Sequence, residues 1–262
     1  MRYEEFTIEG RNAVIEALRS GKPMDKILIQ DGLQDGPIQT IKREAKKHDT
    51  LVKFVEKERL DQISSTGKHQ GVIAYAAAYE YAEVEDILQA AKDKGEPPFV
   101  FLLDNIEDPH NLGAIIRTAN LAGAHGVIIP KNRAVGLTAT VARTSAGALN
   151  YTPVARVTNL AKTIEELKKE GLWFVCADMG GTTMYDLNLT GPIGLVIGNE
   201  GEGVGRLVKE KCDFIASIPM KGDIDSLHPW QQVCWLMRLY VRDYSKWSLL
   251  CTRIIRAVQM RN

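Results

Sequence analysis

The chain has 262 residues, of which 45% are hydrophobic and 25% are charged, and its formal net charge at pH 7 is zero. These values are typical of a globular protein with one large or two modest domains, and they exclude a disordered chain. A neutral chain also lacks the global positive charge that marks many nucleic-acid-binding proteins.

No run of 18 apolar residues occurs, and the N-terminus has no apolar signal core. This predicts a cytoplasmic protein without a membrane span. The four cysteines show no C-x-x-C spacing, so we expect free thiols. The histidines show no metal-ligand pattern, so no metal site is predicted.

Residues 1–78 are expected to form a small mixed α/β domain. Apolar residues recur at helical spacing between Ile8 and Leu18, after a turn at Gly10. Further along we expect strands at 26–29, 52–55 and 71–76, with a charged helix at 37–48. Residues 79–98 are polar, helix-prone and end in Lys-Gly-Glu-Pro-Pro, which predicts a linker that contains a helix.

From Phe99 onward the pattern becomes regular. Short apolar runs alternate with amphipathic stretches, which predicts a parallel sheet covered by helices on both faces. In such sheets ligands bind beyond the carboxyl ends of the strands. The expected strands are 99–103, 126–130, 154–157, 173–177, 194–197 and 214–218, and the expected helices lie near 111–123, 138–148 and 159–170.

The first motif runs from Asp104 to Ala119 and leads from a strand through a turn into a helix. Asn111 is expected at or near the helix N-cap, and Arg117 follows six residues later. An amide and a cation near a strand end are suited to holding a phosphate or a ribose edge. A capped helix with a solvated arginine is the alternative interpretation.

The second motif is the glycine-rich segment from Ile197 to Gly205, Ile-Gly-Asn-Glu-Gly-Glu-Gly-Val-Gly. Glycines let a backbone approach a ligand closely, and a carboxylate held among them, Glu200, can bind a hydroxyl group. The spacing matches neither a dinucleotide-binding loop nor a Walker loop. On its own the segment is compatible with an ordinary glycine-rich turn, and a nucleotide-binding α/β enzyme of another class is an alternative that rests on this loop alone.

The third motif covers 215–227, where a short strand runs into Pro219-Met220-Lys-Gly222 and then Ser226-Leu227. In this order, the three motifs N-x-G-x-x-x-R-T-A, G-N-E-G-x-G and I-P-M-x-G-x-x-x-S-L resemble those of the SpoU (TrmH-like) RNA ribose 2'-O-methyltransferases, which belong to the SPOUT class. The resemblance covers residues 1–227. Residues 1–78 look like the family's substrate-binding domain, with its I-E-G-R-N-A-V opening and H-Q-G-V closing.

The resemblance implies an α/β fold: a small N-terminal α/β substrate-binding domain and, over 99–227, a SPOUT parallel-sheet catalytic domain with a C-terminal trefoil knot. It implies a homodimer that binds S-adenosyl-L-methionine within the knot. The positions that match the family's cofactor contacts are Gly198, Ile218 and Leu227, with Met220 and Ser226 close by. The positions that match its catalytic or RNA-positioning residues are Arg117, Asn111 and Glu200.

The two-domain layout is most similar to the branch of the family that methylates a guanosine ribose of 23S rRNA. Close relatives act on tRNA, so RNA is the expected partner and tRNA is an alternative substrate. Phosphate contacts are expected from basic residues of the N-terminal domain, with an ordinary solvated surface as the alternative: Lys26, Arg43, Lys46 and Lys47.

The sequence departs from this family after Leu227. Relatives continue with Asn-Val-Ser and a helix of small residues, whereas this chain continues with His228-Pro229-Trp230. Residues 228–262 also carry six Arg or Lys, one acidic residue and three of the four tryptophans. Translating plausible codons for 228–235, starting from the last base of the His228 codon, gives Ser (or Pro), Met, Ala, Ala, Gly, a Val-like residue and Leu. We therefore hypothesise a frameshift just after Leu227, which would leave a catalytically impaired, RNA-binding chain as a further alternative.

Overall fold

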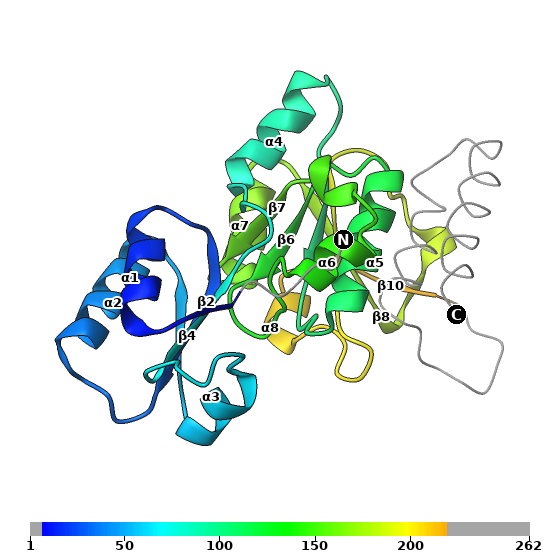
Figure 1. Cartoon of the computed structure of the whole chain (residues 1–262). Coiled ribbons are helices and arrows are strands. Elements are labelled where there is room, and N and C mark those ends of the chain that lie inside the picture. The colour runs from blue at the N-terminus through cyan, green and yellow to red at the C-terminus, as the bar shows by residue number, and fades with distance from the viewer. Residues whose placement is uncertain (1–6, 219–262) are drawn as a thin grey trace. The chain divides into compact units, whose positions relative to one another are not determined.

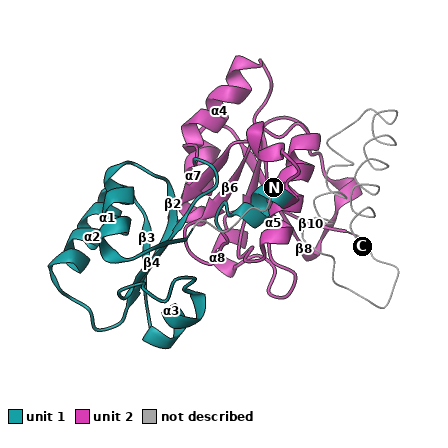
Figure 2. Ribbon diagram, in the orientation of Figure 1, with its two compact units in different colours: residues 1–80, 136–143 teal, residues 81–135, 144–262 magenta. Residues whose placement is uncertain are grey.

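The computed structural model describes residues 7–218, which divide into two compact units (Figure 2). Unit 1 comprises residues 7–80 and 136–143, and unit 2 comprises residues 81–135 and 144–218. Across these described residues no helix is both long and apolar enough to cross a bilayer.

Unit 1 contains a four-stranded sheet in the order β1-β4-β2-β3, flanked by helices (Figure 1). β4 pairs antiparallel with β1 and β2, while β2 and β3 are parallel and joined by the crossover helix α2. Its elements are β1 (Thr7–Glu9), α1 (Arg11–Arg19), β2 (Met24–Gln30), α2 (Gly36–Lys47), β3 (Leu51–Val55), α3 (Lys57–Ile63) and β4 (Val72–Ala76).

The core of unit 1 lies between the sheet and the helices α1 and α2. Val14 and Leu18 of α1 recur at helical spacing, as do Ile38 and Ile41 of α2, and all four side chains are buried in one cluster. Their amphipathic spacing turns one face of each helix toward the sheet. Asp35 starts α2 by accepting a hydrogen bond from the Ile38 N–H at 3.2 Å, as an N-cap residue does.

Unit 2 is a six-stranded sheet in the order β10-β8-β9-β5-β6-β7, and every neighbouring pair is parallel. Residues 139–143 of α6 are grouped with unit 1. The elements of this part of the chain are α4 (Val84–Asp93), β5 (Phe99–Leu103), α5 (Pro109–Leu121), β6 (Gly126–Pro130), α6 (Ala139–Thr144), η1 (Ala148–Asn150), β7 (Val154–Val157), α7 (Leu160–Lys169), β8 (Trp173–Thr183), η2 (Met184–Asp186), β9 (Ile193–Ile197), α8 (Arg206–Lys209) and β10 (Phe214–Ser217).

Strand β5 lies inside this sheet and is covered on both faces, since all five of its side chains are fully buried. Val100 and Leu102 pack with Ile164 of α7 on one face. After β5 the chain forms β6 and then β7, which both lie on one side of β5 in the sheet. Helix α7 then connects β7 to β8, which lies on the other side of β5. The order therefore reverses between β5 and β9, and such a switch point opens a crevice at the carboxyl ends of the strands.

The predicted α/β class and parallel sheet are confirmed, and the predicted runs 99–103, 126–130 and 154–157 match β5, β6 and β7. The helix expected at 138–148 is wrong in length, because α6 ends at Thr144. Ala146 and Gly147 follow with φ of 50° and 90°, which an α-helix cannot include. The closure of the expected knot falls on 219–262, outside the described residues.

Candidate active site

The first two motifs meet at the switch point between β5 and β9. The strands pair in parallel with Leu103 opposite Ile197, so the segments that follow them leave the sheet at the same edge. The Asp104 N–H continues the ladder by donating to the Ile197 carbonyl at 2.9 Å. The sheet itself thus brings together two stretches that are about 90 residues apart in the sequence.

Asp104 joins the glycine loop to the end of β5. Its carboxylate oxygen Oδ2 accepts a hydrogen bond from the Gly205 N–H at 2.8 Å, and the residue is only 9% exposed. A charge-assisted bond in such a buried position holds the loop firmly. Asn105, the next residue, has φ of 57°, a left-handed conformation that asparagine tolerates better than most residues. Asp104 was not predicted as a site residue, although a carboxylate directly after a buried strand was a usable signal.

The glycine loop folds back on itself between β9 and α8. Asn199 Oδ1 accepts hydrogen bonds from the N–H groups of Glu202 at 2.6 Å and Gly203 at 3.1 Å. Gly198 is buried so closely against the Gly203 backbone that a Cβ would overlap it, which explains glycine there. Glu200 is exposed at the turn of this loop. The loop is therefore a tight turn that presents backbone and two carboxylates, Glu200 and Glu202, at the sheet edge.

Helix α5 carries the polar residues of the first motif, but Asn111 is not its N-cap. Asp108 caps the helix by accepting from the N–H groups of His110 at 3.1 Å and Asn111 at 3.3 Å, and Pro109 occupies the first helical position. Asn111 is the third helical residue. Proline fits the first turn because its missing N–H would have no helical partner, and this moves the start of the helix two residues before the predicted one.

Arg117 lies near the middle of α5 and is half-buried. Across 7–218, its guanidinium makes no hydrogen bond or ion pair. At 3.6 residues per turn, six residues place Arg117 about 120° around the helix from Asn111. The helix alone does not bring these two side chains to one face, so any joint role requires a ligand that reaches around α5.

The glycine of the first motif, Gly113, lies where no larger side chain fits. A Cβ at this position would overlap Thr144 and approach the backbone of Ser145, so only glycine lets α5 lie this close to the end of α6. The Thr144 hydroxyl in turn donates to the Pro109 carbonyl at 3.3 Å. This contact fixes the first turn of α5 against the last residue of α6.

Lys131 adds a cation at the same edge of the sheet, directly after β6. Burial, followed by the nearby Arg156 guanidinium, lowers the pKa of its ammonium group. Sequence analysis missed this residue too, and the signal was again a polar side chain directly after a buried strand. No group of three metal-ligating side chains occurs within residues 7–218.

The third motif is only partly described. β10 pairs with β8, and Ile218 follows β10 half-buried, so one strand separates this end of the sheet from β9. Met220, Ser226 and Leu227 lie outside the described residues. The structure brings the first two motifs into direct contact, and it places the start of the third at the β10 end.

Comparisons with known proteins agree over both units. Residues 98–228 match the SpoU rRNA Methylase family, and residues 7–82 match a domain described as RNA 2'-O ribose methyltransferase substrate binding. A Bacillus subtilis (strain 168) protein assigned to the TrmH family of tRNA/rRNA methyltransferases is 51% identical over 230 residues, covering 87% of this chain and 92% of the relative. A Staphylococcus haemolyticus (strain JCSC1435) protein with the same assignment is 49% identical over 226 residues, covering 86% and 90%.

Two solved structures share the fold. The SpoU methyltransferase AviRb from Streptomyces viridochromogenes, in complex with AdoMet, superposes with a TM-score of 0.56 at 24% identity and covers 91% of this chain and 89% of that chain. An AdoMet-bound rRNA methyltransferase from Sinorhizobium meliloti gives 0.55 at 24% identity and covers 91% and 88%.

Proposed function

The chain belongs to the SpoU rRNA Methylase family, and from this premise we propose that it methylates a ribose 2'-hydroxyl of RNA with S-adenosylmethionine as methyl donor. The observation that carries the proposal is the hydrogen bond between Gly205 and Asp104, which joins the first two motifs at the switch point. Ligands of open parallel sheets bind at this position.

The glycine loop fits an adenosyl group. A Cβ at Gly201 or Gly203 would have no atom within 4 Å, so the loop backbone there is open to a ligand. Asp104 and Asn199 hold that backbone in place by accepting hydrogen bonds from the N–H groups of Gly205 and Glu202. We propose that Gly198 and Ile218 contact the cofactor, together with the third-motif residues Met220, Ser226 and Leu227. When bound, S-adenosylmethionine would supply a methyl group on a positively charged sulfur.

Arg117 is proposed to hold the RNA at the reacting hydroxyl. An arginine stays protonated in proteins, so it serves poorly as a general base. A guanidinium can instead bind the neighbouring phosphate and stabilise the negative charge that develops on the 2'-oxygen. Asn111 and Glu200 would orient the ribose, and the hydroxyl proton would leave to water. Alignment of the two reactants can supply up to about 7–11 kcal/mol of barrier lowering in favourable cases.

We propose a guanosine of 23S rRNA as the target, with a tRNA ribose as the alternative substrate. The matching family model is described as an rRNA methylase family, and the relatives are assigned as tRNA/rRNA methyltransferases. The test is to map ribose methylation on rRNA and tRNA from cells with and without the gene. Loss of one methyl group from 23S rRNA is expected. Loss from a tRNA alone would replace the rRNA target, and unchanged maps would contradict the proposal.

A catalytically impaired RNA-binding protein is the second candidate, because the family match ends at residue 228, where the sequence changes character. Calorimetry with S-adenosylmethionine separates the two candidates. The enzyme requires saturable binding of the cofactor, whereas a chain that binds RNA and shows no heat of cofactor binding is the impaired form.

A further inference from the structure

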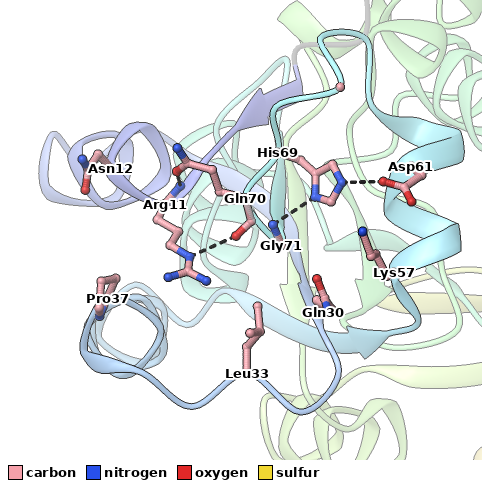
Figure 3. A pocket seen from close by; sticks show the side chains of 11 residues that line it. Arg11, Asn12, Gln30, Leu33, Pro37, Lys57, Asp61, His69, Gln70 and Gly71 are labelled. Carbon is pink, nitrogen blue, oxygen red and sulfur yellow. Dashed lines mark hydrogen bonds and ion pairs between the residues drawn. The ribbon is translucent and has the colours of Figure 1, made fainter.

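Unit 1 holds a cavity of about 670 Å³ between the starts of α1 and α2, helix α3 and the loop that enters β4 (Figure 3). Its volume lies in the range of small-ligand sites. All of its walls come from residues 11–71, so this cavity belongs entirely to unit 1. None of the motif residues assigned to methyl transfer lines it.

Two side chains, Arg11 and His69, make four polar contacts that fix the frame of the cavity. Arg11 donates from Nε to the Gln70 carbonyl at 3.0 Å and from Nη1 to Asp35 at 2.6 Å, which leaves its side chain 26% exposed. His69 is buried, accepts from the Gly71 N–H at Nδ1 (3.0 Å) and meets Asp61 with Nε2 at 2.8 Å. Because Nδ1 accepts, the ring proton lies on Nε2.

Three polar side chains of the lining have no protein partner in this frame. Asn12, Gln30 and Lys57 make no side-chain hydrogen bond or ion pair within the described part of the chain. Both nearby carboxylates are already engaged, Asp35 by Arg11 and Asp61 by His69. Figure 3 shows Gln30 and Lys57 near Gly71 and His69, and the Arg11 guanidinium between Pro37 and Leu33. A ligand of this cavity therefore meets free amides, a free ammonium group and a fixed guanidinium plane.

These groups match the parts of a single nucleotide. Carboxamides donate and accept side by side, as base edges require, and an ammonium group binds phosphate. A fixed guanidinium plane stacks on an unstacked base, a common mode of RNA recognition. The small apolar side chains of Leu33 and Pro37 complete a surface on which a base can lie.

We propose that this cavity binds one unpaired RNA nucleotide, with its base against Arg11 and Gln30 and its phosphate on Lys57. The proposal rests on the proposed function, since it takes RNA as the substrate, and residues 7–82 match a substrate-binding domain. A nucleotide held here anchors the RNA through unit 1, at a site distinct from the residues proposed for chemistry. A continuous duplex cannot insert a base, so the cavity selects loops or bulges.

The test compares two RNAs by fluorescence anisotropy with the full chain, in the absence of S-adenosylmethionine. One is a hairpin with a randomised eight-nucleotide loop, and the other is a fully paired duplex with the same stem. Gln30→Leu and Lys57→Gln should each weaken hairpin binding about tenfold and change duplex binding less than twofold. Lys53→Gln, an exposed lysine of β3 outside the cavity, is the matched control and should change neither affinity.

Hairpin affinities of both variants within twofold of the unmodified chain would overturn the proposal, as would equal losses for hairpin and duplex. Circular dichroism spectra confirm that the variants are folded. Because the readout involves no cofactor, failure of the proposed methyl transfer appears only in calorimetry and methylation maps, whereas failure of this inference appears only in the anisotropy.

Discussion

Arg11 and Arg117 each belong to a proposed site, but their surroundings differ. Arg11 is held by protein partners, whereas Arg117 is not. Arg11 is fixed by Gln70 and Asp35, so its geometry is set before any ligand arrives. Arg117 is half-buried in α5 and has no ion-pair partner among residues 7–218. A partly desolvated guanidinium without a partner is suited to binding an incoming phosphate, because its desolvation cost has already been met in part by folding.

Replacing Arg117 by alanine should therefore reduce methyl transfer by about a hundredfold or more, since removing one donor to a developing oxyanion costs that much. The affinity for S-adenosylmethionine should change less than twofold. The measurements are radiolabelled methyl transfer to RNA from cells that lack the gene, and calorimetry. Arg117→Lys, which keeps the charge but loses the bidentate fork, should recover only part of the rate. Near-normal turnover of Arg117→Ala would remove this residue from the mechanism.

Glu9 carries the clearest pH-dependent contribution to stability in unit 1. Its partial burial would raise the carboxyl pKa, but hydrogen bonds donated by Thr66, Ser64 and Ser65 outweigh burial and lower the pKa to about 2. A pKa below the ordinary value of 4.5 means that the ionised form stabilises the fold. That contribution is complete above pH 4.5 and is lost as pH falls toward 2.

Glu9→Gln should therefore lower the thermal midpoint at neutral pH, and the difference from the unmodified chain should shrink as pH falls from 4.5 to 2. Thermal unfolding monitored by circular dichroism across this range checks the prediction. Glu16→Gln, which alters an exposed carboxylate of α1, is the control and should show a smaller and flatter difference. A Glu9→Gln deficit that stays constant with pH would show that the hydrogen bonds to Glu9 do not depend on its charge.

At the scale of elements, the glycine loop after β9 depends on close backbone contact rather than on flexibility. Gly198 and Gly201 lie one and two positions from Asn199, yet their surroundings differ completely. A Cβ on Gly198 meets the backbone of Gly203, whereas a Cβ on Gly201 meets no atom within 4 Å. The two glycines therefore offer a matched pair of substitutions within one turn.

Gly198→Ala should destabilise unit 2 by about 1–3 kcal/mol, the usual cost of overpacking, and should weaken cofactor binding by displacing the loop. Gly201→Ala should leave the free energy of unfolding within about 0.5 kcal/mol of the unmodified chain. Urea unfolding and calorimetry with S-adenosylmethionine measure the two effects. Equal effects of the two substitutions would mean that the Gly198–Gly203 contact does not shape the site.

The elements that could be predicted from the sequence are those with strong local signals. β5 and β6 match the predicted strands because they are continuous apolar runs bounded by polar or turn residues. β1 and α3 were not predicted, since a three-residue strand and a seven-residue helix carry too little periodicity. β8 extends to Thr183, past the predicted end at Ala177, because pairing with β10 resumes at Thr182 after a register shift.

The site, too, was predictable only where the signal is local. The motifs identified Asn111, Arg117 and Glu200 by pattern, but the long-range partners of a motif depend on strand order, which a single sequence does not reveal. The bond from Gly205 to Asp104 joins residues 101 positions apart. The same holds for the cavity of unit 1, which needs four separate segments between residues 11 and 71 to come together.

At the scale of the whole chain, the two units have separate hydrophobic cores, one around α1 and α2 and one around β5 and α7. Each core is complete within its own unit, so substitutions in the cavity of unit 1 and in the glycine loop of unit 2 should act independently. The proposed division of labour follows from this: unit 1 holds an unpaired nucleotide, and unit 2 performs methyl transfer at the switch point.

After Leu227 the sequence departs from its relatives. We propose that residues 228–262 result from a frameshift, and that the lost Asn, Ser and small-residue segment belongs to the cofactor site and to the dimer. Sequencing the source gene tests the first part, because an unbroken frame without a family-like continuation in either alternative frame would contradict it.

Rebuilding the chain with Asn-Val-Ser-Met-Ala-Ala-Gly-Val-Leu after Leu227 tests the second part, the role of the lost segment. The rebuilt chain should bind S-adenosylmethionine at least about tenfold more tightly, as expected when missing polar contacts are restored, and should be a dimer by light scattering. Equal affinity and equal mass of the two chains would show that the segment after Leu227 contributes to neither property.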